Sequence, residues 1–456
     1  MQNYKLQFKG KKITIMGLGL LGRGLGYTKF LAECGADLIV TDLKTKDQLA
    51  TSLNDLSKFK NIKFVLGEHK LQDFINRDMI IKAAGVPLDS IYIKEAKKNN
   101  IPIEMDVSLF AKCAPEVMVI GVTGTRGKSM TTTLIYEILK ANEKFLKRNV
   151  YIGGNIRGVA TLPLLKKVKE GDILVCELDS WQLQGFGDSK ISPHISVFTT
   201  FMPDHMNYYK NSMNEYFKDK ANIFKYQNKD DILIIRRDMK KLIPKNIKSK
   251  LIVVNTNEIN NWKFIVPGCH QRENLACAVE VAKLFGLSLP VIKNVIKDFK
   301  GVEGRLELLQ TYNGIKIYND NNATTPEATI AGIEAMVDVC KSDSKKTLNL
   351  TNKKLILVCG GADKGLILDG LVKTINKYCK AVVLIPGTGT EMLLTHYKLK
   401  VPNEIGKDLN EVVKIALKYA KKGDTILFSP AFASFGMFNN EYERNDLFMK
   451  IVKGLK

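Results

Sequence analysis

The stretch that decides the fold reads Val117-Met-Val-Ile-Gly-Val-Thr-Gly-Thr-Arg-Gly-Lys128-Ser129 and continues as Met130-Thr-Thr-Thr-Leu-Ile-Tyr-Glu137. It begins as a short apolar run rich in β-branched residues and ends as a helix-forming segment, with a glycine-rich turn between them. Such a turn lets backbone N–H groups close on phosphate oxygens, and the start of the next helix adds partial positive charge. The stretch therefore predicts a strand, a phosphate-binding loop with Gly124, Thr125 and Gly127, and a helix.

The residues that close this loop supply side chains for a nucleotide. Lys128 can reach the β- and γ-phosphates, and the Ser129 hydroxyl can ligate Mg²⁺. The outer glycines, Gly121 and Gly127, have five residues between them, one more than in the strict phosphate-loop pattern. Glu177 ends a second apolar run, where open α/β sheets place their ligands, and it is either a Mg²⁺ ligand or an ordinary strand-end acid. These residues predict a bound nucleoside triphosphate and leave the reaction open.

Apolar runs alternate with helical segments along the rest of the chain. The clearest predicted strands are Lys12–Met16, Leu38–Asp42, Met79–Ile81, Asp172–Glu177, Ile195–Thr199, Lys354–Cys359, Ala381–Ile385 and Thr425–Phe428. Strands that alternate with helices favour mostly parallel sheets. We therefore expect an α/β protein of three successive α/β domains, covering residues 1–112, 113–301 and 302–456.

A second glycine-rich loop follows the first strand. It reads Gly17-Leu18-Gly19-Leu-Leu-Gly22, and Asp42 ends the next strand. This is the dinucleotide fingerprint, in which the glycines admit a pyrophosphate and the acidic residue binds a ribose. From these residues alone the ligand is NAD or another nucleotide with a pyrophosphate. The rest of the chain carries no group of residues suited to hydride transfer.

Composition and charge bound the partners and the compartment. The 456 residues include 69 Lys and Arg against 47 Asp and Glu, a formal net charge of +22. The lysines are spread over the whole chain without a dense basic block, so we expect no nucleic-acid binding. The absence of long apolar runs and of a signal-like N-terminus predicts no membrane span and a cytoplasmic location. Eight scattered cysteines without a C-x-x-C pair favour reduced thiols over disulfides or zinc ligands.

The order of short motifs along the chain resembles that of the Mur ligase family, which builds the peptide stem of bacterial peptidoglycan. The family's form of the phosphate loop, Gly-x-x-Gly-Thr-x-Gly-Lys-Ser, stands at 121–129 and accounts for the extra residue. The further matches are Gly153-Gly-Asn155, Glu177-Leu-Asp-Ser-Trp-Gln-Leu-Gln184, Asp204-His205, Lys220, Gly268-Cys-His270 with Asn274, Gly304-Arg305, Asn319-Asp320-Asn-Asn-Ala-Thr324, Gly360-Gly-Ala-Asp-Lys364 and Ser429-Pro-Ala-Phe-Ala-Ser434. Each alone is explained by a capped turn or a solvated helix face, and their joint order over the chain is what favours the family.

The resemblance implies a Rossmann-like N-terminal domain, a central P-loop ATPase domain and a Rossmann-like C-terminal domain. ATP would be held by Gly124, Thr125, Gly127, Lys128, Ser129, Asn274, Arg305 and Asp320. The catalytic residues would be Lys128, Glu177, His205 and Lys220. Ser129 and Glu177 would bind one Mg²⁺, and His205 and Lys220 would serve a second. Lys220 would then be N-carboxylated, since an ammonium group cannot ligate a cation.

The resemblance also implies the substrates. A UDP-linked muramoyl substrate would contact Gly17, Leu18, Gly19, Asp42, Gly85 and Asn155, and an amino acid would contact Thr324, Lys364 and Ser434. The motifs look most like those of members that add D-glutamate to UDP-N-acetylmuramoyl-L-alanine through an acyl phosphate. Three departures from the usual pattern, Asn322, Gly436 and Glu441, stand at the amino-acid end, so the amino acid is what the sequence specifies least. We expect a monomer.

Two alternatives remain open beside a nucleic-acid-binding ATPase, which only the charge suggests and which DNA-stimulated ATP hydrolysis would support. One is another Mur-type or folylpolyglutamate-type ligase with a different amino acid. The other is an NAD-dependent oxidoreductase with an accessory ATP domain, which bound NAD would support. A ligase is favoured because hydride-transfer residues are missing, and phosphate release that depends on an amino acid would distinguish the two.

Overall fold

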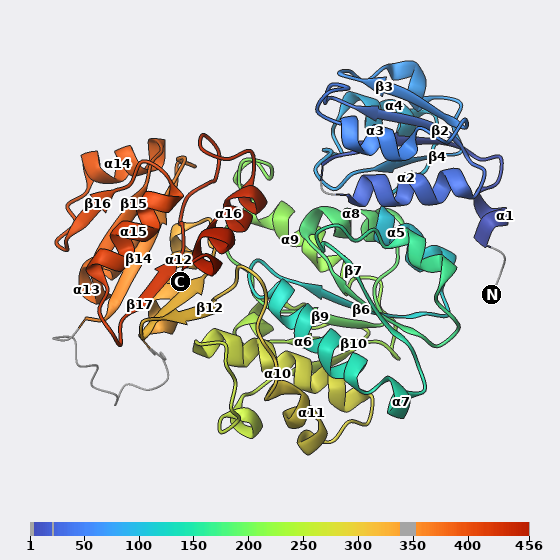
Figure 1. The fold of residues 1–456 in the computed structure, drawn as a ribbon. Coiled ribbons are helices and arrows are strands. Elements are labelled where there is room, and N and C mark those ends of the chain that lie inside the picture. The colour runs from blue at the N-terminus through green and yellow to red at the C-terminus, as the bar shows by residue number, and fades with distance from the viewer. Residues whose placement is uncertain (1–3, 21, 338–352, 456) are drawn as a thin grey trace. The chain divides into compact units, whose positions relative to one another are not determined.

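The computed structural model of the protein describes residues 4–20, 22–337 and 353–455. Three sheets follow one another along the chain (Figure 1). They belong to two compact units, Met1–Asn257 with Asn274–Ile292, and Glu258–Glu273 with Lys293–Lys456. The first unit holds two sheets and the second holds one. The predicted α/β class is confirmed, and of the pairings between described strands only β12–β13 is antiparallel.

The first sheet has the order β3-β2-β1-β4-β5, with all strands parallel. Its strands are β1 (Lys12–Met16), β2 (Asp37–Asp42), β3 (Ile62–Leu66), β4 (Met79–Lys82) and β5 (Ile103–Glu104), and its helices are α1 (Tyr4–Phe8), α2 (Arg23–Glu33), α3 (Ala50–Leu56), η1 (Leu71–Phe74), α4 (Ile91–Lys98) and α5 (Asp106–Cys113). The chain leaves β1 toward β2 and returns on the other side as β4. The loops after β1 and β4 are therefore neighbours, at the point where open sheets bind ligands.

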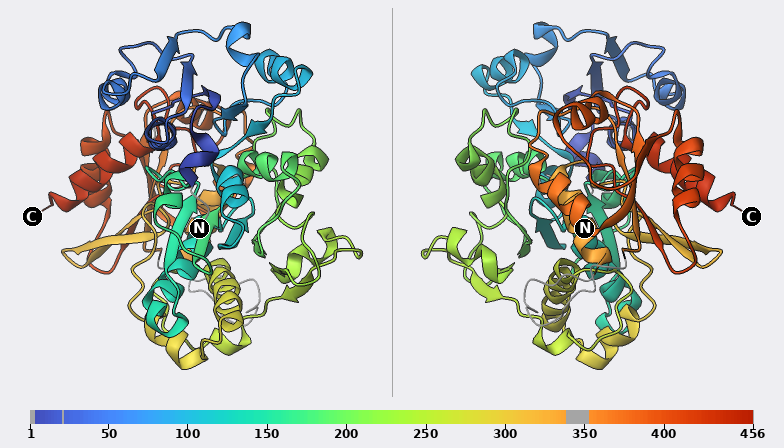
Figure 2. Two further views of the ribbon diagram at one scale, coloured as in Figure 1. Left: turned by 90° about the vertical axis from the view of Figure 1, so that its right-hand side faces the viewer. Right: turned by 90° about the vertical axis from the view of Figure 1, so that its left-hand side faces the viewer.

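The second sheet is also fully parallel, in the order β11-β10-β9-β6-β8-β7. Its strands are β6 (Met118–Thr123), β7 (Val150–Gly154), β8 (Ile173–Glu177), β9 (Ile195–Phe198), β10 (Ile232–Ile235) and β11 (Lys250–Val253). The helical segments are α6 (Lys128–Ala141), α7 (Glu143–Leu146), η2 (Leu162–Lys166), α8 (Ser180–Asp188), α9 (Met213–Ala221), η3 (Arg237–Leu242) and η4 (Asn257–Ile259). Right-handed crossovers in opposite directions put α6 and α8 on opposite faces of this sheet (Figures 1 and 2).

The two sheets of the first unit share one apolar core. Buried residues such as Ile15 of β1 and Leu174 of β8 belong to the same cluster. Asp106, at the start of α5, accepts hydrogen bonds from the backbone N–H groups of Thr161 and Leu162, both at 2.7 Å. These bonds and the common core fix the first sheet against the second within this unit.

The third sheet has the order β12-β13-β17-β14-β15-β16. Its strands are β12 (Glu307–Tyr312), β13 (Ile315–Asn319), β14 (Leu355–Gly360), β15 (Cys379–Ile385), β16 (Asn403–Ile405) and β17 (Thr425–Phe428). Two helices precede this sheet in the chain, α10 (Cys269–Leu284) and α11 (Leu289–Ile296), and their residues from 274 to 292 belong to the first unit. The helices that accompany the third sheet are α12 (Pro326–Met336), α13 (Asp369–Tyr378), α14 (Thr388–His396), α15 (Leu409–Tyr419) and α16 (Glu441–Lys453). The loops after β13, β14 and β17, three neighbouring parallel strands, meet at one edge.

Two expectations concern single features. Six cysteines have free thiols, as predicted: Cys34, Cys113, Cys176, Cys277, Cys359 and Cys379. Cys269 is disulfide-bonded and departs from that prediction. In the described residues, every helix is too short or too polar to cross a bilayer.

Candidate active site

The phosphate loop lies between β6 and α6, as the sequence predicts. Gly124 and Gly127 have φ angles of 144° and 87°, a region that favours glycine. A Cβ on Gly124 would lie 2.1 Å from Thr199 Oγ1, and one on Gly127 would lie 2.5 Å from Asn274 Oδ1. The loop therefore has no space for side chains at these two positions, which is why they are glycines.

Hydrogen bonds to the segment that follows strand β9 hold the loop in place. The N–H groups of Thr125 and Arg126 donate to Thr200 O and Thr200 Oγ1, each at 2.8 Å. Lys128 Nζ donates to Gly124 O at 3.0 Å and to Thr125 O at 3.1 Å. The lysine thus lies over the loop, where a triphosphate would replace its carbonyl partners.

Glu177 stands at the carboxyl end of β8, next to β6, and is 3% exposed. Its Oε1 accepts a 3.4 Å hydrogen bond from Asn155 Nδ2, and the Asn155 N–H donates to Glu177 O at 2.8 Å. Asn155 directly follows β7 and belongs to the Gly153-Gly-Asn155 motif, from which it was predicted to be a site residue. The structure therefore brings Glu177 and Asn155 together beside the phosphate loop.

Lys220, on α9, is 1% exposed and lies against the same loop. Its Nζ donates to Gly124 O at 2.9 Å and lies 4.9 Å from the centre of the Tyr216 ring. Burial, together with the charge of Lys128, holds the pKa of Lys220 well below its ordinary value. A lower pKa favours the neutral amine, which is the form that can react with carbon dioxide.

His205 lies in the loop before α9, in a left-handed conformation with φ of 55°. Its ring packs on Trp181 with a centroid distance of 4.6 Å and lies 6.4 Å from Tyr216. Partial burial, helped by the positive charges of Lys128 and Lys220, lowers the pKa of His205. A neutral imidazole keeps the lone pair that a metal ligand needs.

The side chains present fit Mg²⁺ and a triphosphate. Ser129 lies in the first turn of α6 and Glu177 ends strand β8, and hydroxyl and carboxylate oxygens are ligands that Mg²⁺ prefers. Among the residues that the structure describes, no three His, Cys, Asp or Glu side chains converge as a metal site. In nucleotide enzymes, Mg²⁺ usually takes only one or two carboxylates from the protein and its other ligands from phosphate oxygens and water.

The first glycine loop is organised by Asp42. Its Oδ2 accepts from the Gly19 N–H and its Oδ1 from the Lys44 N–H, both at 2.9 Å. Leu18, between the two glycines, is buried, and Gly85 is exposed in the neighbouring loop after β4. Asp42 is thus in contact with the loop that was predicted to bind the nucleotide.

In the second unit the predicted residues gather at the carboxyl edge of the sheet. Lys364 Nζ donates to Thr324 O at 3.1 Å, and Ala362, two residues before Lys364, forms an antiparallel bridge with Ala433, next to Ser434. Asp320 accepts hydrogen bonds at 3.2 Å from the Leu306 N–H, beside Arg305, and at 3.0 Å from Ser429 Oγ. The structure thus brings the amino-acid-binding candidates together within this unit.

Three family models match the chain in order. They are the MurD-like N-terminal domain of Mur ligases at residues 11–104, the Mur ligase middle domain at 122–283, and the Mur ligase glutamate ligase domain at 304–432. A UDP-N-acetylmuramoylalanine--D-glutamate ligase of Thermoanaerobacter pseudethanolicus is 34% identical over 99% of this chain and 100% of its own length. The chain belongs to the Mur ligase family.

Further relatives and solved structures agree with this assignment. The ligase of the same name from Roseiflexus sp. is 32% identical over 98% of this chain and 99% of its own. The crystal structure of UDP-N-acetylmuramate-alanine ligase MurC from Thermotoga maritima has a TM-score of 0.60 at 18% identity, covering 98% of this chain and all of that one. MurF ligase from the same organism, in complex with ADP, has a TM-score of 0.58 at 17% identity and 99% coverage of both chains. This Mur ligase is thus an ATP-dependent, amide-forming enzyme with the family fold.

Sequence reasoning missed two charged groups of this Mur ligase. Arg126 NH1 lies 3.1 Å from Asp204 Oδ2 and ties the phosphate loop to the His205 loop. Burial raises the pKa of Asp204, but the charges of Arg126, His205 and Lys128 and the hydrogen bond from the His205 N–H together outweigh burial, so the net shift is downward. In the second unit, Arg444 is 1% exposed and donates to Asn321 Oδ1 at 2.8 Å and to Phe432 O at 3.4 Å. Its only sequence signal is an arginine inside an otherwise amphipathic helix.

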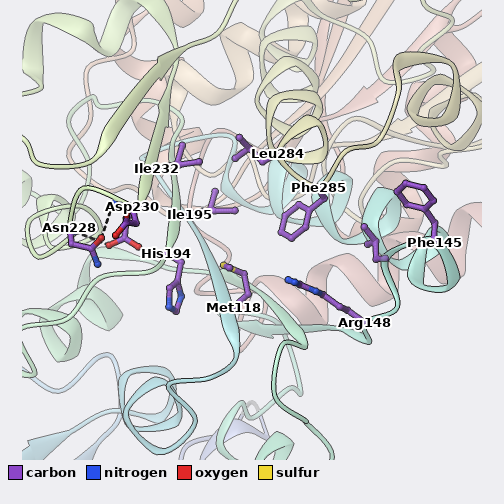
Figure 3. Close-up of a pocket in the computed structure, with 12 residues that line it drawn as sticks. Met118, Phe145, Arg148, His194, Ile195, Asn228, Asp230, Ile232, Leu284 and Phe285 are labelled. Carbon is purple, nitrogen blue, oxygen red and sulfur yellow. Dashed lines mark hydrogen bonds between the residues drawn. The ribbon is translucent and has the colours of Figure 1, made fainter.

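A pocket of about 640 Å³ lies at the opposite edge of the central sheet (Figure 3). Met118, Ile195 and Ile232, which line it, stand at the starts of β6, β9 and β10. Ligands of open α/β sheets bind at the carboxyl ends of the strands, where the phosphate loop lies. This pocket is therefore not the nucleotide site.

Proposed function

We propose that this Mur ligase joins D-glutamate to the carboxyl group of UDP-N-acetylmuramoyl-L-alanine, with conversion of ATP to ADP and phosphate. The curated relatives quoted above carry this activity in their names and match essentially the whole chain. The observation that carries the proposal is the position of Lys220, whose Nζ lies 2.9 Å from Gly124 O in the phosphate loop beside buried Glu177. This position, against the loop proposed to hold the triphosphate, favours an ATP-dependent ligase over an oxidoreductase.

The reaction proceeds in two balanced steps. A carboxylate oxygen of the muramoyl-alanine attacks the γ-phosphorus of ATP, and the bond to the bridging oxygen breaks with its electron pair going to ADP. The amine of D-glutamate then attacks the acyl carbon, loses a proton, and expels phosphate with the C–O electron pair. Lys128, Asn274, Arg305 and Asp320 would position the nucleotide, and Lys128 would neutralise the charge that spreads over the transferred group.

Two magnesium ions are proposed, one near Ser129 and Glu177 and one served by His205 and Lys220. When bound, magnesium offsets the negative charge of the phosphates and of the acyl oxygen. Lys220 would act as a carbamate: its amine lone pair bonds to carbon dioxide, one C–O π pair moves to oxygen, and the N–H proton leaves. The full burial of Lys220 and its low pKa support this modification.

The substrates are assigned to the glycine loops and the third sheet. The UDP part would bind at Gly17, Leu18, Gly19, Asp42 and Gly85, and the muramoyl-alanine end would lie near Asn155 and His205. The amino acid would bind at Thr324, Lys364 and Ser434. The proposed domains are residues 1–112, 113–301 and 302–456, and we propose a monomeric cytoplasmic enzyme without nucleic-acid binding.

The decisive assay measures phosphate release from ATP with UDP-N-acetylmuramoyl-L-alanine and a panel of D- and L-amino acids. We expect release with D-glutamate, and a product heavier than the UDP substrate by one glutamyl residue in mass spectrometry. Release with another amino acid only would replace D-glutamate in the proposal. Release that is independent of the UDP substrate would contradict it, and so would NAD that copurifies with the protein and turns over.

A further inference from the structure

Lys82 is a buried lysine to which the reaction above gives no role. It ends strand β4, is 2% exposed, and lies immediately before the loop that contains Gly85. Its Nζ donates to Val86 O in that loop at 2.9 Å and to Gln184 Oε1 at 3.3 Å. Gln184 is on α8, so the lysine joins the proposed UDP loop to a helix of the central sheet.

Gln184 continues the network toward α9. Its Nε2 donates to Asp219 Oδ2 at 2.8 Å and to the Tyr208 hydroxyl at 3.0 Å. The Tyr209 hydroxyl donates to the same Asp219 oxygen at 3.0 Å. Asp219 directly precedes Lys220, and hydrogen bonds therefore lead from strand β4 to the helix that carries the proposed carbamate.

Aromatic contacts connect the same network to the other proposed metal ligand. Tyr208 packs edge-on against Trp181 at 5.6 Å between ring centroids, and Trp181 packs on His205 at 4.6 Å. Tyr209 packs on Tyr216 at 4.9 Å, and Tyr216 lies under the Lys220 amine. Residues that hydrogen-bond to Gln184 or Asp219 thus also support His205 and Lys220.

The charges of Lys82 and the carboxylates near it favour a single arrangement of this hydrogen-bond network. A buried lysine is costly unless polar or charged partners compensate it. The carboxylates of Asp179, Asp188 and Asp219 supply the opposite charge, and Asp219 is the one that Gln184 joins to Lys82. The Gln184 amide must point its oxygen at Lys82 and its nitrogen at Asp219, because the reverse orientation would break both contacts. A buried network satisfied in this way specifies one arrangement of the elements that it joins.

We infer that Lys82 is a positioning residue that holds helix α9, and with it Lys220, in register with the UDP-binding loop by way of Gln184 and Asp219. This inference rests on the proposed function, since it assigns the carbamate to Lys220 and part of the UDP substrate to the loop of Gly85. It predicts that carboxylation of Lys220 and binding of the UDP substrate depend on a lysine that touches neither ATP nor the amino acid.

The test compares Lys82→Met with the wild type and with Lys97→Met. Lys97 is a matched control because it is a lysine whose side chain is 45% exposed. Its ion pair with the carboxylate of Asp188 is long, at 3.9 Å, so its loss should have little effect. The carbamate is observed directly by ¹³C NMR after equilibration with ¹³C-bicarbonate, and kcat and the KM values for ATP and the UDP substrate are measured separately. For Lys82→Met we expect a weaker carbamate signal and a roughly 10- to 100-fold loss of kcat/KM for the UDP substrate, with the KM for ATP unchanged.

Two further variants keep the test decisive if Lys82→Met folds poorly. Gln184→Leu breaks the same link from the other side and should give the same pattern. Lys82→Met combined with Asp219→Asn leaves neither charge unpaired, so it should recover part of the carbamate signal.

Three results would overturn the inference. They are a full carbamate signal and wild-type kinetics in Lys82→Met, strictly additive effects in the double variant, or an equal loss of every kinetic parameter together with the melting temperature. If the wild type does not ligate D-glutamate, the proposed function fails, while the ¹³C signal of the wild type and of Lys82→Met still decides the inference.

Discussion

Single residues near the phosphate loop divide into those that the sequence predicts and those that depend on the fold. Lys128, Ser129 and Glu177 follow apolar strands directly, so their place at the carboxyl edge of a parallel sheet follows from the chain order. Lys220 and His205 lie in a polar helix and a turn, where local sequence gives no sign of burial. The burial of Lys82 and Arg444 was not predicted. The side chains to which they donate hydrogen bonds, Gln184 and Asn321, are 102 and 123 residues away in the sequence.

Lys128 is the residue whose loss should stop the reaction with the least effect on the fold. Its amine makes hydrogen bonds to carbonyl groups of its own loop. We expect Lys128→Ala to lower phosphate release at least about 100-fold, since a positioned cation on the transferred group is lost, with an unchanged circular dichroism spectrum. Lys140→Ala, on the exposed face of the same helix, is the matched control and should retain activity. Near-normal turnover of Lys128→Ala would contradict the role.

Lys220 gives a chemical test at the residue scale. Lys220→Ala should lose turnover, because alanine has no amine that could carry the proposed carbamate. Short carboxylates such as formate or acetate should restore part of the activity, as measured by phosphate release over a concentration series. Full activity of the variant without any additive would remove the carbamate from the account.

At the scale of elements, most strands were correctly predicted from apolar runs, including β1, β6, β8 and β17. The hairpin of β12 and β13 was missed, although Asn313-Gly314 between them, with φ angles of 50° and 78°, is the strongest short hairpin signal. Strand β12 is only partly buried along its length, so its apolar pattern is weak. The antiparallel edge of the third sheet is therefore where pattern reasoning was insufficient.

The turn between β6 and α6 makes a stability prediction for that element. In Gly124→Ala the new methyl group would lie 2.1 Å from Thr199 Oγ1, so both backbone strain and crowding apply. Gly171→Ala is the matched control, because it also has positive φ, of 77°, but no atom within 4 Å of the added carbon. We expect the control to cost about 1–2 kcal/mol and Gly124→Ala about 2 kcal/mol more, as measured by thermal unfolding. Equal losses of stability in the two variants would contradict the close packing of Thr199 against Gly124.

The buried end of strand β4 should make stability depend on pH. Burial lowers the pKa of Lys82 to about 8, from about 10.4 in an unfolded chain. Between these values the unfolded state holds the proton and the folded state does not, so the contribution of Lys82 to stability rises with pH across this window. The melting temperature of the wild type, measured relative to that of Lys82→Met, should therefore rise from pH 8 to pH 10. Parallel curves for the two proteins would contradict the low pKa.

At the scale of the whole molecule, the order of motifs carried more information than any one of them. The family models match residues 11–104, 122–283 and 304–432, in the order that the motifs predict. The amino acid was the least determined feature, because Asn322, Gly436 and Glu441 depart from the family pattern while Thr324, Lys364 and Ser434 still gather at one sheet edge. The net charge of +22 predicted nothing specific, since it is spread over the chain.

The central claim is that the γ-phosphoryl group of ATP passes to a substrate carboxylate and not to water. It is tested most directly with UDP-N-acetylmuramoyl-L-alanine labelled with ¹⁸O in its terminal carboxylate. Turnover with ATP and D-glutamate should release phosphate that carries one ¹⁸O atom, because the oxygen that attacks phosphorus leaves with it. Released phosphate without ¹⁸O, alongside normal product, would show that no acyl phosphate forms and would contradict the account.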